Sequence, residues 1–267
     1  SRALVLLYEA VNDSFTEWVF RGELFEYPEP LRSIECPNVG KFGDKWVVIV
    51  SPQGPVEYFI GDIDFDTYKF SWEHRGVLNN STNYYATNLV YDQKGRCILL
   101  GAIEGFEGAV GWNGAGALPR ELTLSADGTR LEQKIIPEVE VLRKKAQEIC
   151  GPIVTKSGTF ELKATFQSGK EDIIILSYSG NNIEIKIKDG KLIAGNCSVE
   201  LSKDTATNIV RIFMDKSVLE IFTDDRETLS FVVPVCTGGC LIEASELPRE
   251  FILWEYDTSN VFTHYDD

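Results

Sequence analysis

Few side chains in this sequence are arranged in a way that could do chemistry. Glu35 follows the apolar Ile34 and precedes Cys36-Pro37, at the predicted edge of a strand. A carboxyl group in such surroundings can be withdrawn from water, which favours its protonated form and keeps a proton available for a leaving-group oxygen. The pattern is compatible with a general acid, but taken alone it is more typical of an ordinary surface carboxylate.

Other groups of ligand-type residues fit their chemistry less well. Positions 1, 3, 5 and 12 of a calcium-loop spacing are occupied by Asp62, Asp64, Asp66 and Glu73. Position 6 is Thr67 where the loop needs glycine, so we expect no calcium site. His74 and His264 lie far apart without ligand spacing around them, so we expect no zinc site either.

The segments that must position these residues are predicted to be β-strands almost throughout. Short apolar or alternating runs recur between Gly, Asn and Asp turns, for example at 45–50, 57–60 and 97–100. Up to residue 136 these strands carry many aromatic side chains and come in groups separated by longer loops. Such grouping is typical of propeller blades.

The second half of the chain has a stricter pattern. Residues 159–166 and 183–188 alternate between apolar and polar, which predicts antiparallel strands with one dry face. The strands at 209–214 and 218–222 flank a tight turn at Asp215-Lys216-Ser217. Strands of this kind pack best as two stacked sheets, so we expect an all-β chain with a β-sandwich over residues 153–267.

A charged stretch separates the two halves. Residues 137–152 lie between Pro137 and Gly151-Pro152, and Leu142, Ala146 and Ile149 have helical spacing. This pattern predicts a linker with about two helical turns. We therefore place the domain boundary here, after a first domain of residues 1–136.

Composition excludes several classes of partner. The 267 residues include 41 acidic and 26 basic side chains, for a formal net charge of -15 at pH 7. Such a surface repels phosphate backbones, so we expect no nucleic acid. No run approaches the ~20 apolar residues that span a bilayer, so we expect no membrane partner.

The six cysteines are scattered along the chain. Cys236 and Cys240 are compatible with either a disulfide or two thiols, so the cysteines do not indicate the cellular compartment.

Three segments, in this order, resemble glycoside hydrolase family 32, the invertases, levanases and inulinases. The first contains Ile34-Glu35-Cys36-Pro37-Asn38 and residues 58–64. The second contains Tyr84-Tyr85-Ala86-Thr87-Asn88, residues 95–101, Gly111-Trp112 and residues 118–124. The third spans residues 211–222.

The resemblance implies a five-bladed propeller followed by a β-sandwich, and cleavage of β-fructosidic bonds with retention. Glu35 then corresponds to the acid/base, and Tyr85 to an aromatic residue that binds substrate. Trp112 and Arg120 are expected to brace the last blade without touching substrate. No cofactor is implied, because retaining glycosidases work with two carboxyl groups and water.

The sequence departs from this family in ways that affect its chemistry. The family's nucleophile, an Asp in a Trp-Met-Asn-Asp-Pro-like segment, and its transition-state Asp in an Arg-Asp-Pro segment both precede the Glu-Cys-Pro motif. Only 34 residues precede Glu35 here, and they contain neither segment. Ile34 and Ala102 stand where Trp is usual, and Asn38 where Asp is common. We therefore expect a truncated propeller that holds half of a catalytic pair and is inactive alone.

Two hypotheses follow for the function. In the first, an upstream polypeptide completes the propeller and supplies the nucleophile, and the assembly is a β-fructofuranosidase for sucrose or fructans; sucrose, inulin and levan remain equal alternatives. In the second, the chain is a non-catalytic relic that binds carbohydrate or forms a homo-oligomer. Exposed strand edges of a part-propeller must be covered in either case.

Overall fold

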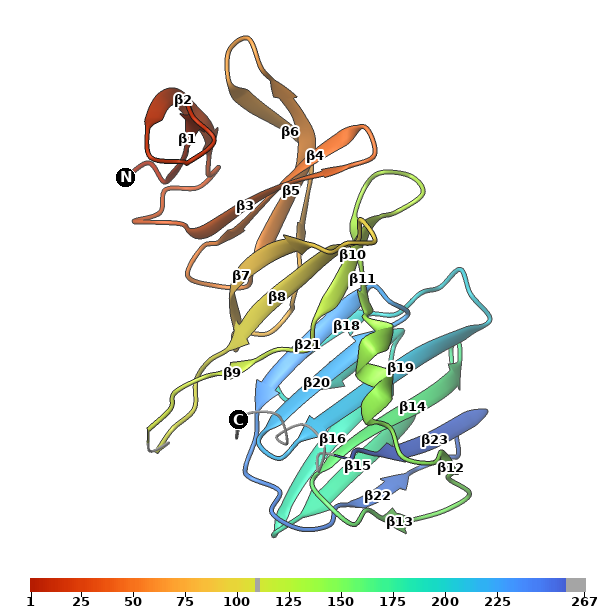
Figure 1. Ribbon diagram of the computed structural model, residues 1–267. Helices are drawn as coiled ribbons and strands as arrows, with labels where there is room; N and C mark the ends of the chain where they lie inside the picture. The colour runs from red at the N-terminus through yellow and green to blue at the C-terminus, as the bar shows by residue number, and fades with distance from the viewer. Residues whose placement is uncertain (109–110, 258–267) are drawn as a thin grey trace.

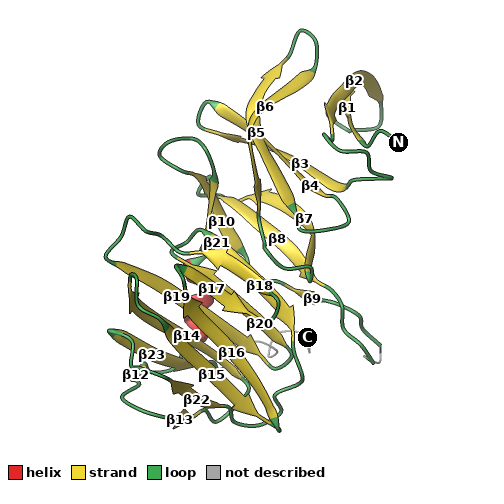
Figure 2. Cartoon of the chain, turned by 180° about the vertical axis from the view of Figure 1, so that it is seen from behind, coloured by secondary structure: helices red, strands yellow, loops and turns green. Residues whose placement is uncertain are grey.

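The computed structural model of the chain describes residues 1–108 and 111–257, so His264 lies outside the described residues. These residues fold into five antiparallel sheets, and none of the five closes on itself (Figure 1). Figure 2 shows the same arrangement from behind, with strands in most of the chain. The prediction of an all-β chain is confirmed.

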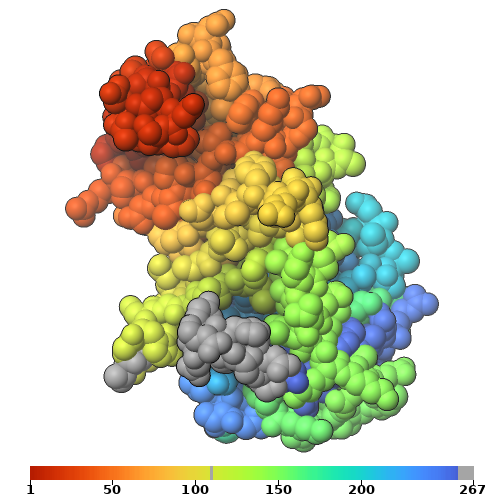
Figure 3. Space-filling view, viewed as in Figure 1, coloured from red at the N-terminus to blue at the C-terminus, as the bar shows by residue number. Residues whose placement is uncertain are grey.

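The first sheet is a hairpin at the N-terminal end. It consists of β1 (Leu4–Ala10) and β2 (Trp18–Glu26). Phe25 and Val5 of the hairpin are buried against the next sheet, whereas Tyr8 and Phe20 on its other side are exposed. Figure 3 shows this hairpin as a separate red lobe at one end of the molecule.

The next sheet carries Glu35 on its edge strand. Its order is β3 (Glu35–Phe42), β4 (Lys45–Ser51), β5 (Glu57–Asp64) and β6 (Lys69–Val77). The run from Val47 to Val50 is buried on both faces, because Val47 and Ile49 belong to one hydrophobic cluster and Val48 and Val50 to another. A strand buried on both faces needs a continuous apolar run, which is what the sequence has at 45–50.

A five-stranded sheet follows. Its path is β11 (Leu131–Ile135), β10 (Arg120–Leu124), β8 (Cys97–Ile103) and β7 (Tyr84–Tyr91), and β9 (Ala115–Gly116) pairs with β8. Leu99 and Ile103 of this sheet share a cluster with Val47 and Ile60 of the preceding one. The two sheets therefore pack together, and their first strands, β3 and β7, are neighbours.

Two six-stranded sheets form the second half. One has the order β12 (Gln147–Glu148), β23 (Glu250–Glu255), β14 (Thr159–Gln167), β19 (Thr207–Asp215), β20 (Val218–Thr223) and β21 (Glu227–Val232). The other has the order β13 (Ile153–Val154), β22 (Leu241–Ala244), β15 (Asp172–Tyr178), β16 (Asn181–Lys188), β17 (Lys191–Ala194) and β18 (Cys197–Glu200). The alternating side chains of both sheets meet in the largest hydrophobic cluster.

Residues 137–152, between the two halves, contain a short helix and a short strand. The two expected helical turns are a 3-10 helix, η1 (Pro137–Leu142). The helical spacing of Leu142, Ala146 and Ile149 gave a wrong prediction for the residues after it, which are extended. The Ile149 N–H donates to the Phe251 carbonyl at 2.8 Å, so pairing with β23 replaces a further helical turn.

Within the described residues, no helix is long and apolar enough to cross a membrane.

Candidate active site

Glu35 lies at the start of the edge strand β3, opposite Ser51 of β4. Its side chain is exposed, whereas the acid/base interpretation allowed for a carboxyl group withdrawn from water. The edge position explains the difference, because on its free side no further strand of the same sheet covers it. Its one side-chain partner among the described residues is Tyr85, whose hydroxyl lies 2.9 Å from Glu35 Oε2.

Tyr85 comes from the neighbouring sheet and is half-buried on β7. Its hydroxyl is 3.0 Å from the Ser51 carbonyl oxygen and accepts the N–H of Gln53 at 3.2 Å. The one phenolic proton is thus offered to both Ser51 and Glu35. Burial, and then the hydrogen bond to Glu35, raise the pKa of Tyr85 to about 12, so the phenol stays a donor at neutral pH.

Each strand is interrupted by a β-bulge directly after its site residue. In β3 the pairing moves from Glu35–Ser51 to Asn38–Ile49, and in β7 it moves from Tyr85–Ala102 to Asn88–Leu100. Each strand therefore contains one residue more than its partner. The extra residue follows a left-handed residue in both cases, Cys36 with φ 46° and Ala86 with φ 50°. Bulges re-aim neighbouring side chains, and these two turn Glu35 and Tyr85 toward each other.

The residues that depart from the family pattern lie close to this pair. Ala102 is the direct ladder partner of Tyr85, so a methyl group stands where an aromatic ring is usual. Ile34 packs against the cluster beneath the hairpin. The Ser51 carbonyl and the Gln53 N–H were missed by sequence reasoning, because a backbone group carries no sequence signal.

The acidic residues with calcium-loop spacing are engaged by protein donors. Lys45 Nζ lies 2.8 Å from Asp62 and 3.0 Å from Glu73. Asp64 caps its own turn, accepting from the Asp66 N–H and the Thr67 hydroxyl. Across residues 1–108 and 111–257, no group of three His, Cys, Asp or Glu side chains is arranged to hold a metal ion. Cys236 and Cys240 are both buried free thiols.

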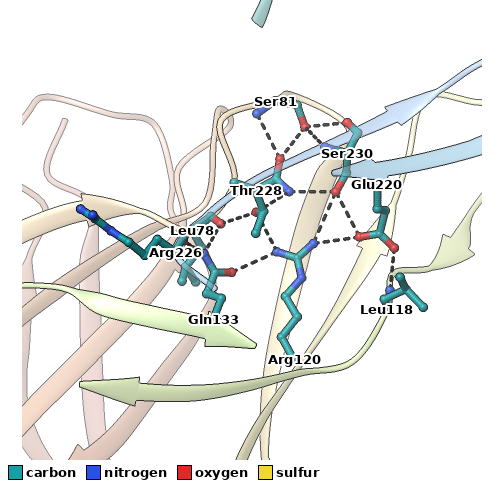
Figure 4. A network of polar contacts seen from close by, with 10 residues as sticks. Leu78, Ser81, Leu118, Arg120, Gln133, Glu220, Arg226, Thr228 and Ser230 are labelled. Carbon is teal, nitrogen blue, oxygen red and sulfur yellow. Dashed lines mark hydrogen bonds and ion pairs between the residues drawn. The ribbon is translucent and has the colours of Figure 1, made fainter. Parts of the chain in front are cut away.

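A second carboxylate lies in the opposite environment. Glu220 of β20 and Arg120 of β10 form an ion pair of 2.9 Å, and their side chains are 3% and 0% exposed. Figure 4 shows Arg120 surrounded by hydrogen-bond acceptors from both halves of the chain, including Gln133 and Thr228, each at 3.1 Å. The guanidinium also lies 4.1 Å from the centre of the Tyr84 ring.

The Arg120 cluster is buried and consists of Asn79, Arg120, Gln133, Glu220, Thr228 and Ser230. Glu220 uses its second oxygen to accept the Leu118 N–H at 2.7 Å, so both of its oxygens are engaged. Arg120 therefore braces the contact between the five-stranded sheet and the second half, whereas the sequence analysis expected a brace within the last blade. Trp112 is exposed and packs edge-on against Phe106 at 4.8 Å.

Comparison with protein families decides the relationship. The family model for the glycosyl hydrolases family 32 N-terminal domain matches residues 1–134. The chain belongs to glycoside hydrolase family 32. The match covers every described residue of the Glu35–Tyr85 site.

Family 32 relatives agree with this assignment over most of the chain. A sucrose-6-phosphate hydrolase of Bacillus subtilis (strain 168) is 27% identical over 81% of this chain and 53% of its own length. One from Streptococcus mutans is 28% identical over 85% of this chain and 54% of its own length. The chain thus spans about half the length of these curated relatives.

Solved family 32 structures have the same fold. The β-fructofuranosidase of Bombyx mori matches 95% of this chain and 60% of its own, with a TM-score of 0.78 and 23% identity. The sucrose-6-phosphate hydrolase of Lactobacillus gasseri matches the same shares, with a TM-score of 0.80 and 21% identity. A mutant of the Bombyx mori enzyme has been solved in complex with sucrose.

Proposed function

We propose that this chain supplies the acid/base half of a retaining β-fructosidase site, with Glu35 as the acid/base and Tyr85 as its partner at the substrate. The observation that carries the proposal is the 2.9 Å contact between the two, which joins separate family motifs across two sheets. Protonated Glu35 gives its proton to the leaving-group oxygen, and the resulting carboxylate then activates water. Sucrose or a fructan is the substrate class, because one similar enzyme has been solved with sucrose and another is named a fructan 1-exohydrolase.

Retention requires a second carboxyl group ~5 Å from the first. The 267 residues contain no Asp-Pro pair of the kind that carries the family's nucleophile. We infer that a polypeptide outside these residues provides that Asp. The exposed apolar face of the hairpin, with Leu6, Tyr8 and Phe20 about half exposed, offers it a surface to pack on.

The same proposal assigns the sheets their roles. The hairpin, the four-stranded sheet and the five-stranded sheet, within residues 1–136, are blades of a five-bladed-type propeller. Residues 137–152 connect them to a β-sandwich of residues 153–267, formed by the two six-stranded sheets. The likeness to solved family 32 structures over 95% of the chain supports this division.

The test is fructose release from sucrose and inulin by the purified chain, alone and with an added polypeptide that carries the Asp-Pro motifs. We expect release only in the mixture, and a loss of about 100- to 10,000-fold for Glu35→Gln. An aryl β-fructoside, whose good leaving group needs no acid, should lose less. Glu107→Gln changes an equally exposed carboxylate and is the matched control. Release that is insensitive to Glu35→Gln would refute the proposal.

A second function is favoured by one observation. Ala102 beside Tyr85 leaves the site without the Trp that is usual at that position, and aromatic side chains form the walls of many sugar sites. A non-catalytic relic that binds carbohydrate needs neither a nucleophile nor a conventional fructosyl pocket, so it tolerates that change better. Calorimetry with sucrose, fructose and short fructans separates the two: binding without fructose release, in a folded mixture with the added polypeptide, supports the second function.

A further inference from the structure

Asn38 connects the two strands that carry Glu35 and Tyr85. Its Nδ2 donates to the carbonyl of Cys36 at 2.9 Å and to the carbonyl of Thr87 at 2.8 Å. Its Oδ1 accepts the N–H of Leu89 at 3.0 Å. Both amide hydrogens and the amide oxygen are therefore engaged, on β3 behind Glu35 and on β7 behind Tyr85.

These contacts replace backbone pairing that the fold does not supply. The strands β3 and β7 belong to different sheets, so no ladder of backbone hydrogen bonds fixes one against the other. Cys36 and Ala86 both hold left-handed backbone that residues with a Cβ rarely adopt. In β3 the Asn38 amide binds the carbonyl of the left-handed Cys36. In β7 it binds the Thr87 carbonyl and the Leu89 N–H, which follow the left-handed residue, so one side chain fixes both bulges.

We propose that Asn38 is a positioning residue: its amide locks the two bulges together and thereby holds the Glu35 carboxylate against the Tyr85 hydroxyl. This inference rests on the proposed function for its chemical meaning, because Glu35 is the acid/base there. The amide is required. An Asp carboxylate at this position has no hydrogens to donate and would face two carbonyl oxygens, so the Asp that is common in the family could not hold this geometry while ionised.

Asn88 is the matched control within the same chain. It occupies the place in the β7 bulge that Asn38 occupies in the β3 bulge. Asn88 is exposed, and within residues 1–108 and 111–257 its side chain has no hydrogen-bond partner. The change Asn88→Asp therefore adds the same charge at a bulge without disturbing the link between the strands.

The test uses the full chain with ¹³Cζ-labelled tyrosine, observed by NMR at neutral pH. The Tyr85 signal is assigned from its absence in Tyr85→Phe. Glu35→Gln is expected to shift this signal in the wild type and in Asn88→Asp. In Asn38→Asp and Asn38→Ala we expect most of that shift to be lost, because the two side chains no longer meet. A full shift in folded Asn38→Asp would overturn the proposal.

Two further measurements keep the test decisive. If both Asn38 variants fail to fold, amide hydrogen exchange is measured in the wild type. The Leu89 N–H should be protected from exchange. Exchange as fast as in an amide without a hydrogen bond would overturn the proposal. Where the mixture described above releases fructose, Asn38→Asp should lower kcat about 100-fold with little change in KM, and Asn88→Asp should not. If no fructose is released, the proposed function fails, while the NMR result still judges Asn38.

Discussion

Two carboxylates of this chain reach from one sheet to another, and they lie in opposite surroundings. Glu35 is exposed at a strand edge, and within the described residues its one side-chain hydrogen bond is to Tyr85. Glu220 is 3% exposed and accepts hydrogen bonds from Arg120, Leu118 and Ser230. The difference shows that an exposed carboxylate is suited to react with a ligand and a buried, paired one to hold sheets together. A carboxyl group whose oxygens still have free lone pairs can exchange a proton with a ligand. One whose oxygens all accept hydrogen bonds holds two sheets together.

The largest effect is expected at the buried pair. Arg120→Met leaves the Glu220 charge buried without its partner, and we expect a loss of about 3–5 kcal/mol in the free energy of unfolding. Urea denaturation measures it. Adding Glu220→Leu to this variant should restore part of the loss, because the uncompensated charge is gone. Arg2→Met removes an exposed ion pair with Glu26 and should change little; equal losses in the two single variants would contradict the comparison.

Two adjacent tyrosines provide a finer contrast. The Tyr84 hydroxyl is buried and has no hydrogen-bond partner among the described residues, so Tyr84→Phe should leave stability unchanged or raise it, by up to about 1–3 kcal/mol. Tyr85→Phe removes the contacts to Glu35 and Ser51 and should cost about 0.5–1.5 kcal/mol. Thermal unfolding of both variants tests the opposite signs. A loss of stability for Tyr84→Phe would show that the Tyr84 hydroxyl makes a hydrogen bond.

The contact at the exposed pair can be measured by titration. Burial and the Glu35 hydrogen bond raise the pKa of Tyr85 to about 12, from an ordinary value of 10.0. Glu35→Gln removes the second cause and leaves the first, so the pKa of Tyr85 should fall only part of the way back. A ¹³C NMR titration of labelled tyrosine measures it, with Glu107→Gln as control. An unchanged pKa in Glu35→Gln would mean that the two groups do not meet in solution.

The smallest effect concerns acid stability. Arg96 lies 2.7 Å from Glu138, and its hydrogen bond lowers the pKa of Glu138 from 4.5 to about 2. Because the folded-state pKa is the lower one, this pair stabilises the fold above about pH 4.5 and loses that contribution as the pH falls toward 2. Glu138→Gln should therefore lose less stability on acidification than the wild type. Urea midpoints between pH 6 and 3 test this, and identical slopes would contradict it.

Much of the fold could be predicted from the pattern of side chains. The apolar run at 45–50 is β4, and the alternating runs at 159–166 and 183–188 lie in β14 and β16. The turn expected at Asp215-Lys216-Ser217 joins β19 and β20, with Lys216 at a φ of 53°. The alternating runs carry this information because one face of each of those strands is buried, and the continuous run does so because β4 is buried on both faces.

The site was only partly predictable. The family motifs pointed to Glu35 and Tyr85, but the local pattern did not decide between a Glu35 withdrawn from water and an exposed one. The left-handed positions of the two bulges are occupied by Cys36 and Ala86, and not by glycine, which would have indicated them in the sequence. Asn38 differed from the Asp that is common in the family, but its contacts could not be predicted. The helical spacing after Leu142 was misleading, because pairing with β23 overrides weak local preference. Contacts between sheets decide these features, and they are absent from local sequence.

The Arg120 cluster also constrains the order in which the molecule can fold. Asn79 hydrogen-bonds Thr228 and Ser230, 149 and 151 residues further along, and Arg120 reaches Glu220 across 100 residues. Contacts of such long sequence separation form slowly, because a large loop must close before they contribute. During synthesis the first half therefore emerges with Asn79 and Arg120 still hydrated. The two halves can dock only after the strand at 227–232 has left the ribosome, so we expect their docking to be the last step of folding.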